Sequence, residues 1–146
     1  MLKKNEVGPQ TYRDAMARFA GAVHVITTDG VAGRRGATVI AACSVSDAPP
    51  TVLVCLNREN AKNEAFVQNG NFALNTLASD QQALAEWDRI ATGAPALLGG
   101  LAVFDCQIID SKDHATHRVL FGKVTGIRIG DTLHPLIYFN RDYRIS

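Results

Sequence analysis

The stretch from Ala37 to Asn63, ATVIAACSVSDAPPTVLVCLNRENAKN, constrains the fold more than any other part of the chain. It begins with the small, apolar and almost uncharged run Ala37–Val45, which predicts a strand. Ser46–Pro50 contains two prolines, and since proline cannot donate to a strand ladder, this segment predicts a turn. Thr51–Leu56 is β-branched and apolar, which is typical of a buried strand.

A polar loop follows the second of these strands. We expect the segment Asn57–Asn60 to lead into a helix over Ala61–Gln68, with Asn60 as its N-cap. A strand of small residues lets a flat ligand approach its backbone, and a polar loop at a helix N-terminus presents N–H groups to a phosphate. Together these features predict a site for a planar, phosphorylated cofactor.

Turn signals recur along the rest of the chain at the spacing of an antiparallel sheet. Glycine-rich and polar residues predict turns at Asp29–Arg35 and Asp110–Ala115. Arg34 and Arg35 are expected to be solvated at a loop tip, and the alternative is contact with a cofactor phosphate. Further strands are expected at Val23–Thr28, Phe72–Leu77, Leu101–Ile109, Thr116–Ile129 (with a bulge near Gly122 or Gly126) and Leu136–Phe139. Six or seven strands with few, short helices favour a barrel or a sandwich over a parallel α/β fold.

Two more helices are expected. The first begins at Thr11 and ends at Gly21, and its apolar face is expected to pack on the sheet. The second covers Asp80–Trp87 with Ser79 as its N-cap. The apolar face of the first helix consists of Tyr12, Ala15, Met16 and Phe19.

The whole chain, residues 1–146, is expected to form one domain, because no repeat, low-complexity tract or linker divides it. Residues 1–10 are expected to form a flexible arm, and Asn140–Ser146 an exposed tail.

Composition limits the possible partners. The 146 residues carry a net charge of +1, which gives no reason to expect nucleic acid as a partner. No run is long and apolar enough to span a bilayer, and the first residues lack the apolar core of a secretory signal. Cys43, Cys55 and Cys106 stand singly in strand-like runs, so we expect reduced, buried thiols and a cytoplasmic location.

The sequence lacks the usual catalytic motifs. Its cysteines and histidines do not have the spacing of metal ligands, so no metal site is expected. Neither a nucleophile elbow nor a phosphate loop occurs, and no carboxylate pair stands out as an acid and base. Either the protein only binds a ligand, or a cofactor carries the chemistry.

Six stretches in series give the chain a family resemblance, and the block in which CSVS, PP and VCLN follow one another is the most specific. They are YRDAMARFAGAVHVITTDG (12–30), GATVIAACSVSDAPPTVLVCLNRENAKN (36–63), FALNTL (72–77), LLGGLAVFDC (97–106), ATHRVLFGKV (115–124) and PLIYFNRDYR (135–144). With these residues the chain resembles the short-chain flavin reductase family, which has the FMN-binding split-barrel fold. It is similar to the reductase components of two-component aromatic monooxygenases of the 4-hydroxyphenylacetate 3-monooxygenase type.

The resemblance implies roles for individual residues. His117 would sit near the nicotinamide and act as the catalytic residue, while Arg141 and Tyr143, with Tyr138, would approach the cofactor or a partner subunit. Two further groups would bind the flavin. The isoalloxazine ring would be lined by Thr38, Val39, Ile40, Ala41, Cys43, Ser44 and Val45, and the ribityl and phosphate end would be held by Asn57, Arg58, Asn60, Ala61 and Lys62.

The implied fold is a split β-barrel, mainly β with a few short helices and six or seven antiparallel strands. The implied activity is that of an NAD(P)H-dependent flavin reductase. It would pass hydride from NADH or NADPH to FAD or FMN, as a homodimer that supplies reduced flavin to a monooxygenase. Hydride transfer to a flavin needs no acid or base from the protein. The alternatives are a flavin- or haem-binding split barrel without catalysis and a purely structural barrel.

The chain departs from the family pattern after Leu77. The family usually has a longer segment before the position of Gly93, whereas here Gln81–Trp87 runs straight through. Either this member is shortened, or a segment is missing from the sequence. Val39 and Ile40 also stand where relatives often have smaller or hydroxylated residues.

Overall fold

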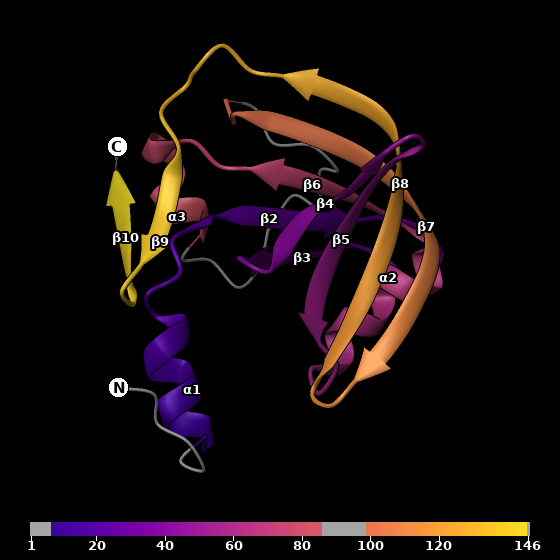
Figure 1. The fold of residues 1–146 in the computed structure, drawn as a ribbon. Helices are drawn as coiled ribbons and strands as arrows, with labels where there is room; N and C mark the ends of the chain where they lie inside the picture. The colour runs from indigo at the N-terminus through magenta and orange to yellow at the C-terminus, as the bar shows by residue number, and fades with distance from the viewer. Residues whose placement is uncertain (1–6, 86–98, 146) are drawn as a thin grey trace.

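The computed structural model describes residues 7–85 and 99–145 (Figure 1). Seven antiparallel strands form the main sheet, in the order β3-β2-β6-β7-β8-β5-β4. They are β2 (His24–Thr28), β3 (Arg35–Val39), β4 (Ala42–Asp47), β5 (Pro50–Asn57), β6 (Asn71–Thr76), β7 (Ala102–His114) and β8 (His117–Ile129). This confirms the predicted antiparallel β fold, in which the main sheet has seven strands.

A second, three-stranded sheet lies beside the first (Figure 1). It has the order β1-β9-β10 and consists of β1 (Gly21–Ala22), β9 (Leu136–Phe139) and β10 (Asp142–Ile145). The tail expected after Phe139 is exposed apart from the half-buried Tyr143, but the sequence did not predict that it forms a strand, in which Tyr143 pairs with Tyr138.

The edge strands β3 and β4 follow one another in the chain, and this is where the barrel is split. The single strand expected over Ala37–Val45 is therefore wrong. Val39 still pairs with His24 of β2, whereas Ala42 already pairs with Val54 of β5. A composition of small apolar residues suits a strand on either side, so it does not reveal where the chain changes partner.

The longest hairpin differs from the expectation at its tip. β7 continues to His114, so the polar turn expected over Asp110–Ala115 is wrong for all but its last residue. The tip is solvated on both faces, and polar residues there can extend the ladder without needing a core. The register shifts near Gly122 and Gly126 confirm the predicted bulge.

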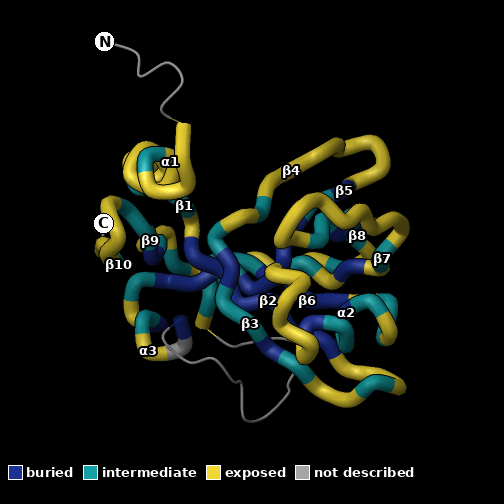
Figure 2. The backbone as a smooth tube through the Cα atoms, turned by 90° about the horizontal axis from the view of Figure 1, so that it is seen from below, coloured by how far each residue is buried: buried dark blue, intermediate teal, exposed yellow. Residues whose placement is uncertain are grey.

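Two apolar clusters stabilise the fold. Figure 2 shows that the buried residues are concentrated in the strands. The larger fills the barrel and includes Ile26, Val54, Phe66, Phe72 and Leu120. The smaller joins the two sheets through Val23, Val25, Leu77, Ala85 and Leu136. Each large side chain buried in this way contributes about 1.5–3 kcal/mol.

The helix α1 (Pro9–Met16) does not pack as expected. It ends at Met16 rather than at Gly21, and none of its residues is buried. Tyr12 on the helix and Phe19 beyond its end are 58% and 69% exposed. Its N-cap is Gly8, which provides no side-chain cap, and Pro9 and Gln10 belong to the helix rather than to a flexible arm. Residues 1–6 lie outside the described part of the chain.

The other helices are short. Ala61–Asn63 is a 3₁₀ turn that continues into α2 (Glu64–Asn69), which confirms the helix expected after Asn60. The second 3₁₀ turn, Ser79–Gln81, leads into α3 (Gln82–Ala85). Ala78 rather than Ser79 takes the cap position, and its N–H donates to the Gln81 side chain at 2.9 Å.

The cysteines are free, but they are not uniformly buried. Cys106 is buried, which raises the pKa of its thiol to about 12, whereas Cys55 is half-buried and Cys43 is exposed. The expectation of three buried thiols is therefore wrong for Cys43. Among the described residues, no helix has the length and apolar composition that a membrane crossing requires.

Candidate functional site

A cavity of about 590 Å³ lies between strand β3, the segment that follows β5, and the beginning of β8. Its size is within the range of small-molecule sites, about 300–1,000 Å³. One wall comes from Ala37 to Ala41, and Cys55 and Leu56 of β5 contribute beside it. Polar side chains also line the cavity, and they come from Arg35 at the start of β3, from four residues of the segment 57–63 and from His117 of β8.

Four of the residues predicted to line the flavin ring, Thr38–Ala41, lie in this wall of the cavity. The hydroxyl of Thr38 donates to the backbone oxygen of Ala85 at 2.8 Å, so this side chain is tied to α3. Val39 is 7% exposed and belongs mainly to the barrel core. Ala37 also packs against this core and Ile40 against the smaller cluster, so the backbone and the exposed Ala41 form the most accessible part of the wall.

Asparagine side chains fix the loop between β5 and α2. The Asn57 side-chain oxygen accepts from the N–H of Glu59 at 2.9 Å, and that of Asn60 accepts from the N–H of Lys62 at 3.1 Å. Asn63 is buried, and its Nδ2 donates to the backbone oxygen of Asn57 at 2.9 Å. The loop thus holds Asn57, Asn60 and Lys62 in place along the cavity.

His117 lies where the cavity meets the turn between β7 and β8. It is the first residue of β8 and pairs with Asn57 of β5. Its Nδ1 and the hydroxyl of Thr116 are 2.9 Å apart, and which of the two donates depends on the tautomer of the ring. The histidine predicted to be catalytic is therefore held in the same cavity as the predicted ring wall.

Arg35 also lines this cavity, whereas the sequence favoured a solvated position for it. It is the first residue of β3, and its Nε and Nη2 donate to the Asn63 side-chain oxygen at 3.2 and 3.1 Å. The expectation of a solvated loop residue is therefore wrong for Arg35. The alternation of Arg35 and Ala37 on one strand face would have indicated its direction if the start of the strand had been recognised.

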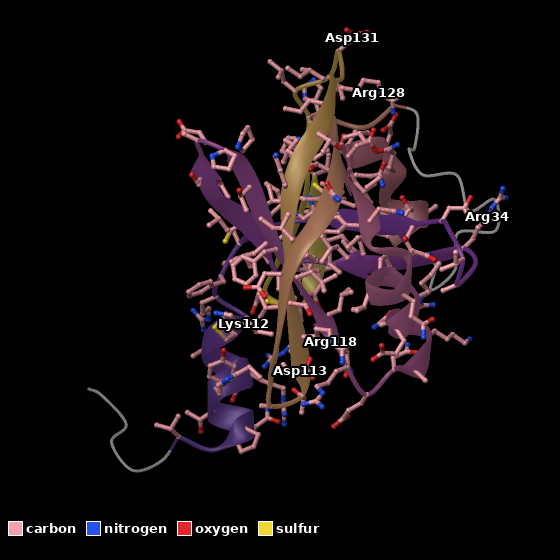
Figure 3. The ribbon with its side chains drawn as sticks, turned by 90° about the vertical axis from the view of Figure 1, so that its right-hand side faces the viewer. Arg34, Lys112, Asp113, Arg118, Arg128 and Asp131 are labelled. Carbon is pink, nitrogen blue, oxygen red and sulfur yellow. The ribbon has the colours of Figure 1, made fainter. Side chains whose placement is uncertain are left out.

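Arg58 does not line the cavity. Its guanidinium donates to the backbone oxygen of Ala115 at 3.3 Å and lies 3.5 Å from Asp113. Arg118 contacts the same carboxylate at 2.6 Å and reaches Glu64 of α2 at 2.7 Å, and Figure 3 shows Arg118 and Asp113 near the end of the long hairpin. The hydrogen bond from Arg118 lowers the pKa of Asp113 below its usual value.

Other predicted site residues lie elsewhere. Cys43 and Ser44 line a second, mainly apolar cavity of about 380 Å³, and Val45 follows them on β4. Arg141 is 2.6 Å from Asp14 of α1, and the rings of Tyr143 and Tyr138 meet edge to face at 5.4 Å. Ala61 begins the 3₁₀ turn without lining the first cavity. The roles predicted for these residues stay predictions.

The first cavity fits a planar, phosphorylated ligand. Its uncharged wall can contact an aromatic ring, and Arg35 and Lys62 are cations that can contact a phosphate. No lining residue that the structure describes is a carboxylate, so nothing in this lining opposes an anion. In residues 7–85 and 99–145, no cluster of three His, Cys, Asp or Glu side chains is placed to hold a metal ion.

Comparison with known sequences gives a consistent result. The family model described as "Flavin reductase like domain" matches residues 16–87 and 85–146. The FMN reductase (NADH) RutF of Pantoea ananatis is 43% identical, and the alignment covers 97% of this chain and 83% of that protein.

Solved structures agree with the fold. The flavin reductase component BorF of a bacterial two-component tryptophan halogenase superposes with a TM-score of 0.87 at 27% identity, covering 94% of this chain and 98% of that one. The styrene monooxygenase flavin reductase of Pseudomonas putida gives a TM-score of 0.83 at 25% identity, covering 93% and 97%.

The comparisons also concern the segment after Leu77, where the sequence departs from the family pattern. The alignment with the Pantoea protein extends over 157 residues, more than the 146 of this chain, so that protein has residues without a counterpart here. The family match breaks into two parts that meet at residues 85–87. This is where the sequence departs from the family pattern.

Proposed function

The chain belongs to the flavin reductase like domain family, and on this premise we propose that it transfers hydride from NADH to FMN. The observation that carries the proposal is the cavity with an uncharged wall along β3 and cations beside the loop that follows β5. FMN and NADH are preferred to FAD and NADPH because the curated relative is named for them. We propose further that the reduced flavin serves a monooxygenase, as in the styrene monooxygenase system.

The residues that line the cavity would act by positioning the flavin and the nicotinamide. Ala37 and Ala41 let a ring approach the backbone, Asn60 and Lys62 orient the polar end, and His117 borders the space left for the nicotinamide. A bound flavin supplies the hydride acceptor, so the protein need not provide an acid or base. Its contribution is to hold donor and acceptor in contact and in the right orientation.

The proposed function is tested by the decay of NADH absorbance with the purified protein. The assay is run without flavin, with FMN and with FAD, and each series is repeated with NADPH. We expect decay that requires added flavin, saturates with it and is faster with FMN and NADH. A protein that binds flavin tightly without oxidising either nicotinamide would instead be a binding protein.

Replacement of Arg58 and Lys62 together by glutamine should raise the KM for FMN. Each charge-assisted hydrogen bond to an anion contributes about 1.5–3 kcal/mol, so loss of one direct contact corresponds to at least roughly a tenfold increase. The single variants divide the effect, and we expect Lys62→Gln to account for most of it because Arg58 is held by Asp113. Unchanged flavin kinetics in the double variant would refute both roles.

We also propose that the protein is a homodimer in the cytoplasm. In support of a dimer, Tyr12, Met16 and Phe19 of the α1 segment are 58%, 38% and 69% exposed, more apolar surface than a monomer needs there. The three free thiols support a reducing compartment. Sedimentation equilibrium should give twice the mass of the chain; a monomer at micromolar concentration would contradict the dimer.

A further inference from the structure

Resting on the proposed function, we infer that Arg118 is a positioning residue, which ties the end of the β7–β8 hairpin to α2 and so holds His117 beside the nicotinamide. His117 lines the first cavity, whereas Arg118, the next residue of β8, does not. Successive side chains of a strand point to opposite faces of the sheet, which accounts for this difference. Arg118 therefore acts on a ligand in this cavity without touching it.

The end of this hairpin needs such a tie because it has no buried residue. All positions from 109 to 117 are exposed, and His117 is the last of them. Segments with few buried contacts open at lower free energy than a packed core does. Backbone pairing of His117 with Asn57 joins the hairpin to β5, and a side-chain contact on the other face of β8 adds a second point of attachment.

Arg118 provides this attachment with two sides of its guanidinium. Its Nε donates at 2.6 Å to Asp113, its cross-strand partner on β7, and its Nη1 donates at 2.7 Å to Glu64. Glu64 is the first residue of α2, and Phe66, two residues later, is fully buried in the barrel core. The end of the hairpin is thus connected to the core through α2.

The contacts of Arg118 differ from those of an ordinary surface ion pair. Exposed pairs contribute little, but the Arg118 side chain is only 19% exposed and contacts two carboxylates with different nitrogens. A planar guanidinium can hold two partners in fixed directions, which the ammonium of a lysine cannot do. Glu64 is 46% exposed, and its replacement by glutamine leaves Arg118 paired with Asp113, so we expect this variant to fold.

Charge alone would have a different effect from position. FMN and NADH are anions, so a nearby positive charge favours their binding and a nearby negative charge opposes it. Removal of the Glu64 carboxylate should therefore improve the reaction if only charge matters, and impair it if position matters. Lys112 is the matched control for Arg118, because it is an exposed cation on the same hairpin and lies outside this group of ion pairs (Figure 3).

The test measures kcat/KM for NADH at saturating FMN, and the dissociation constant of FMN is measured separately by quenching of flavin fluorescence. We expect Arg118→Gln to lower kcat/KM by about tenfold and Glu64→Gln by about threefold, with less than about a twofold change in FMN binding. Lys112→Gln should change neither quantity. Arg118→Lys should retain only part of the parent activity, because lysine lacks the planar fork.

A double-mutant cycle with His117→Ala tests whether Arg118 acts through His117. In the His117→Ala background, Arg118→Gln should have little further effect on kcat/KM, because the side chain that Arg118 positions is already gone. Equal effects of Arg118→Gln in the two backgrounds would overturn the inference. Unchanged kinetics in both Arg118→Gln and Glu64→Gln would also overturn it, and Glu64→Gln decides alone if Arg118→Gln does not fold.

The remaining outcomes separate this inference from the proposed function. If Lys112→Gln lowers kcat/KM as much as Arg118→Gln does, or if Glu64→Gln raises it, charge is responsible and the inference is wrong. If the parent protein oxidises NADH with FMN but His117→Ala leaves kcat/KM unchanged, the proposed function stands and the inference fails. If the parent protein oxidises no NADH, the proposed function fails together with the inference.

Discussion

The free energy of unfolding should fall by about 3 kcal/mol when the pH is lowered from 7 to 4, because of His24. This side chain is 9% exposed, and its burial lowers its pKa to about 4 from an ordinary value of 6.5. Its Nδ1 lies 2.9 Å from the hydroxyl of Thr76, which suits a neutral ring. Between pH 6.5 and 4 the unfolded chain takes up a proton that the folded chain does not, so stability decreases as the pH falls.

Urea unfolding at a series of pH values from 4 to 8 measures this effect. The control is His24→Gln, which keeps a polar group near Thr76 but cannot titrate. It should lose most of the pH dependence between 4 and 6.5, whatever its own stability. The pKa values of Asp14 and Asp113 are lowered from an ordinary 3.8, so the stability they contribute is lost only below this range. An equal slope in the variant would show that other groups cause the pH dependence.

Substitution of Gly122 by valine should destabilise the barrel by about 3 kcal/mol or more, without contact to the candidate site. A Cβ atom at this position would lie 2.5 Å from the Phe72 ring and 2.9 Å from the Cβ of Cys106. Both neighbours are buried, with 2% and 4% of their surface exposed, so neither can move away into solvent. The cost is steric and arises in the packed core.

Gly126→Ala is the matched control on the same strand, because a Cβ there would meet Asp105 at an ordinary 3.4 Å. We expect a change within about 0.5 kcal/mol for it. Phe72→Leu should recover part of the loss when combined with Gly122→Val, since it removes the atoms in conflict. Additive destabilisation by the two substitutions in thermal or urea unfolding would contradict this explanation.

Much of the fold could be predicted because local patterns agree with the tertiary structure. The strands at Thr51–Leu56, Phe72–Leu77 and Leu136–Phe139 were expected within one or two residues of their observed bounds. In each, β-branched or apolar residues are bounded by turn residues, and both signals act at short range. The cap by Asn60 is equally local, because its partner is two residues away.

The errors concern properties that depend on distant contacts. The change of partner near Ile40 depends on β2 and β5, which flank this point of the chain on the two sides of the split. Helix α1 has a periodic apolar face, but periodicity does not say what covers that face. The helix expected over Asp80–Trp87 is observed up to Ala85, and its last two residues lie outside the described part of the chain.

The residues that line the candidate site were predicted where they belong to one continuous block of sequence. They were not predicted where the fold brings a residue from another part of the chain to the cavity. Lys62, Asn60 and the wall at Thr38–Ala41 belong to one continuous block of sequence. Arg35 precedes that block, and its direction depends on the hydrogen bonds with Asn63, 28 positions away. The resemblance implied a place for Arg58 at the phosphate end of the flavin, and this stays a prediction; in the structure Arg58 pairs with Asp113 of a distant hairpin.

The three-stranded sheet β1-β9-β10 is expected to open more easily than the barrel. It is tied to α1 by the N–H of Asn140, which donates to Ala17 at 2.8 Å, and by the pair of Arg141 with Asp14. Apart from Leu136, its strands have no buried residue, whereas the barrel has its own core. Segments with few buried contacts open at lower free energy than the core, and they open cooperatively. We therefore expect helix α1 and strands β1, β9 and β10 to open as one unit of local unfolding, with amides that exchange with solvent sooner than those of the barrel.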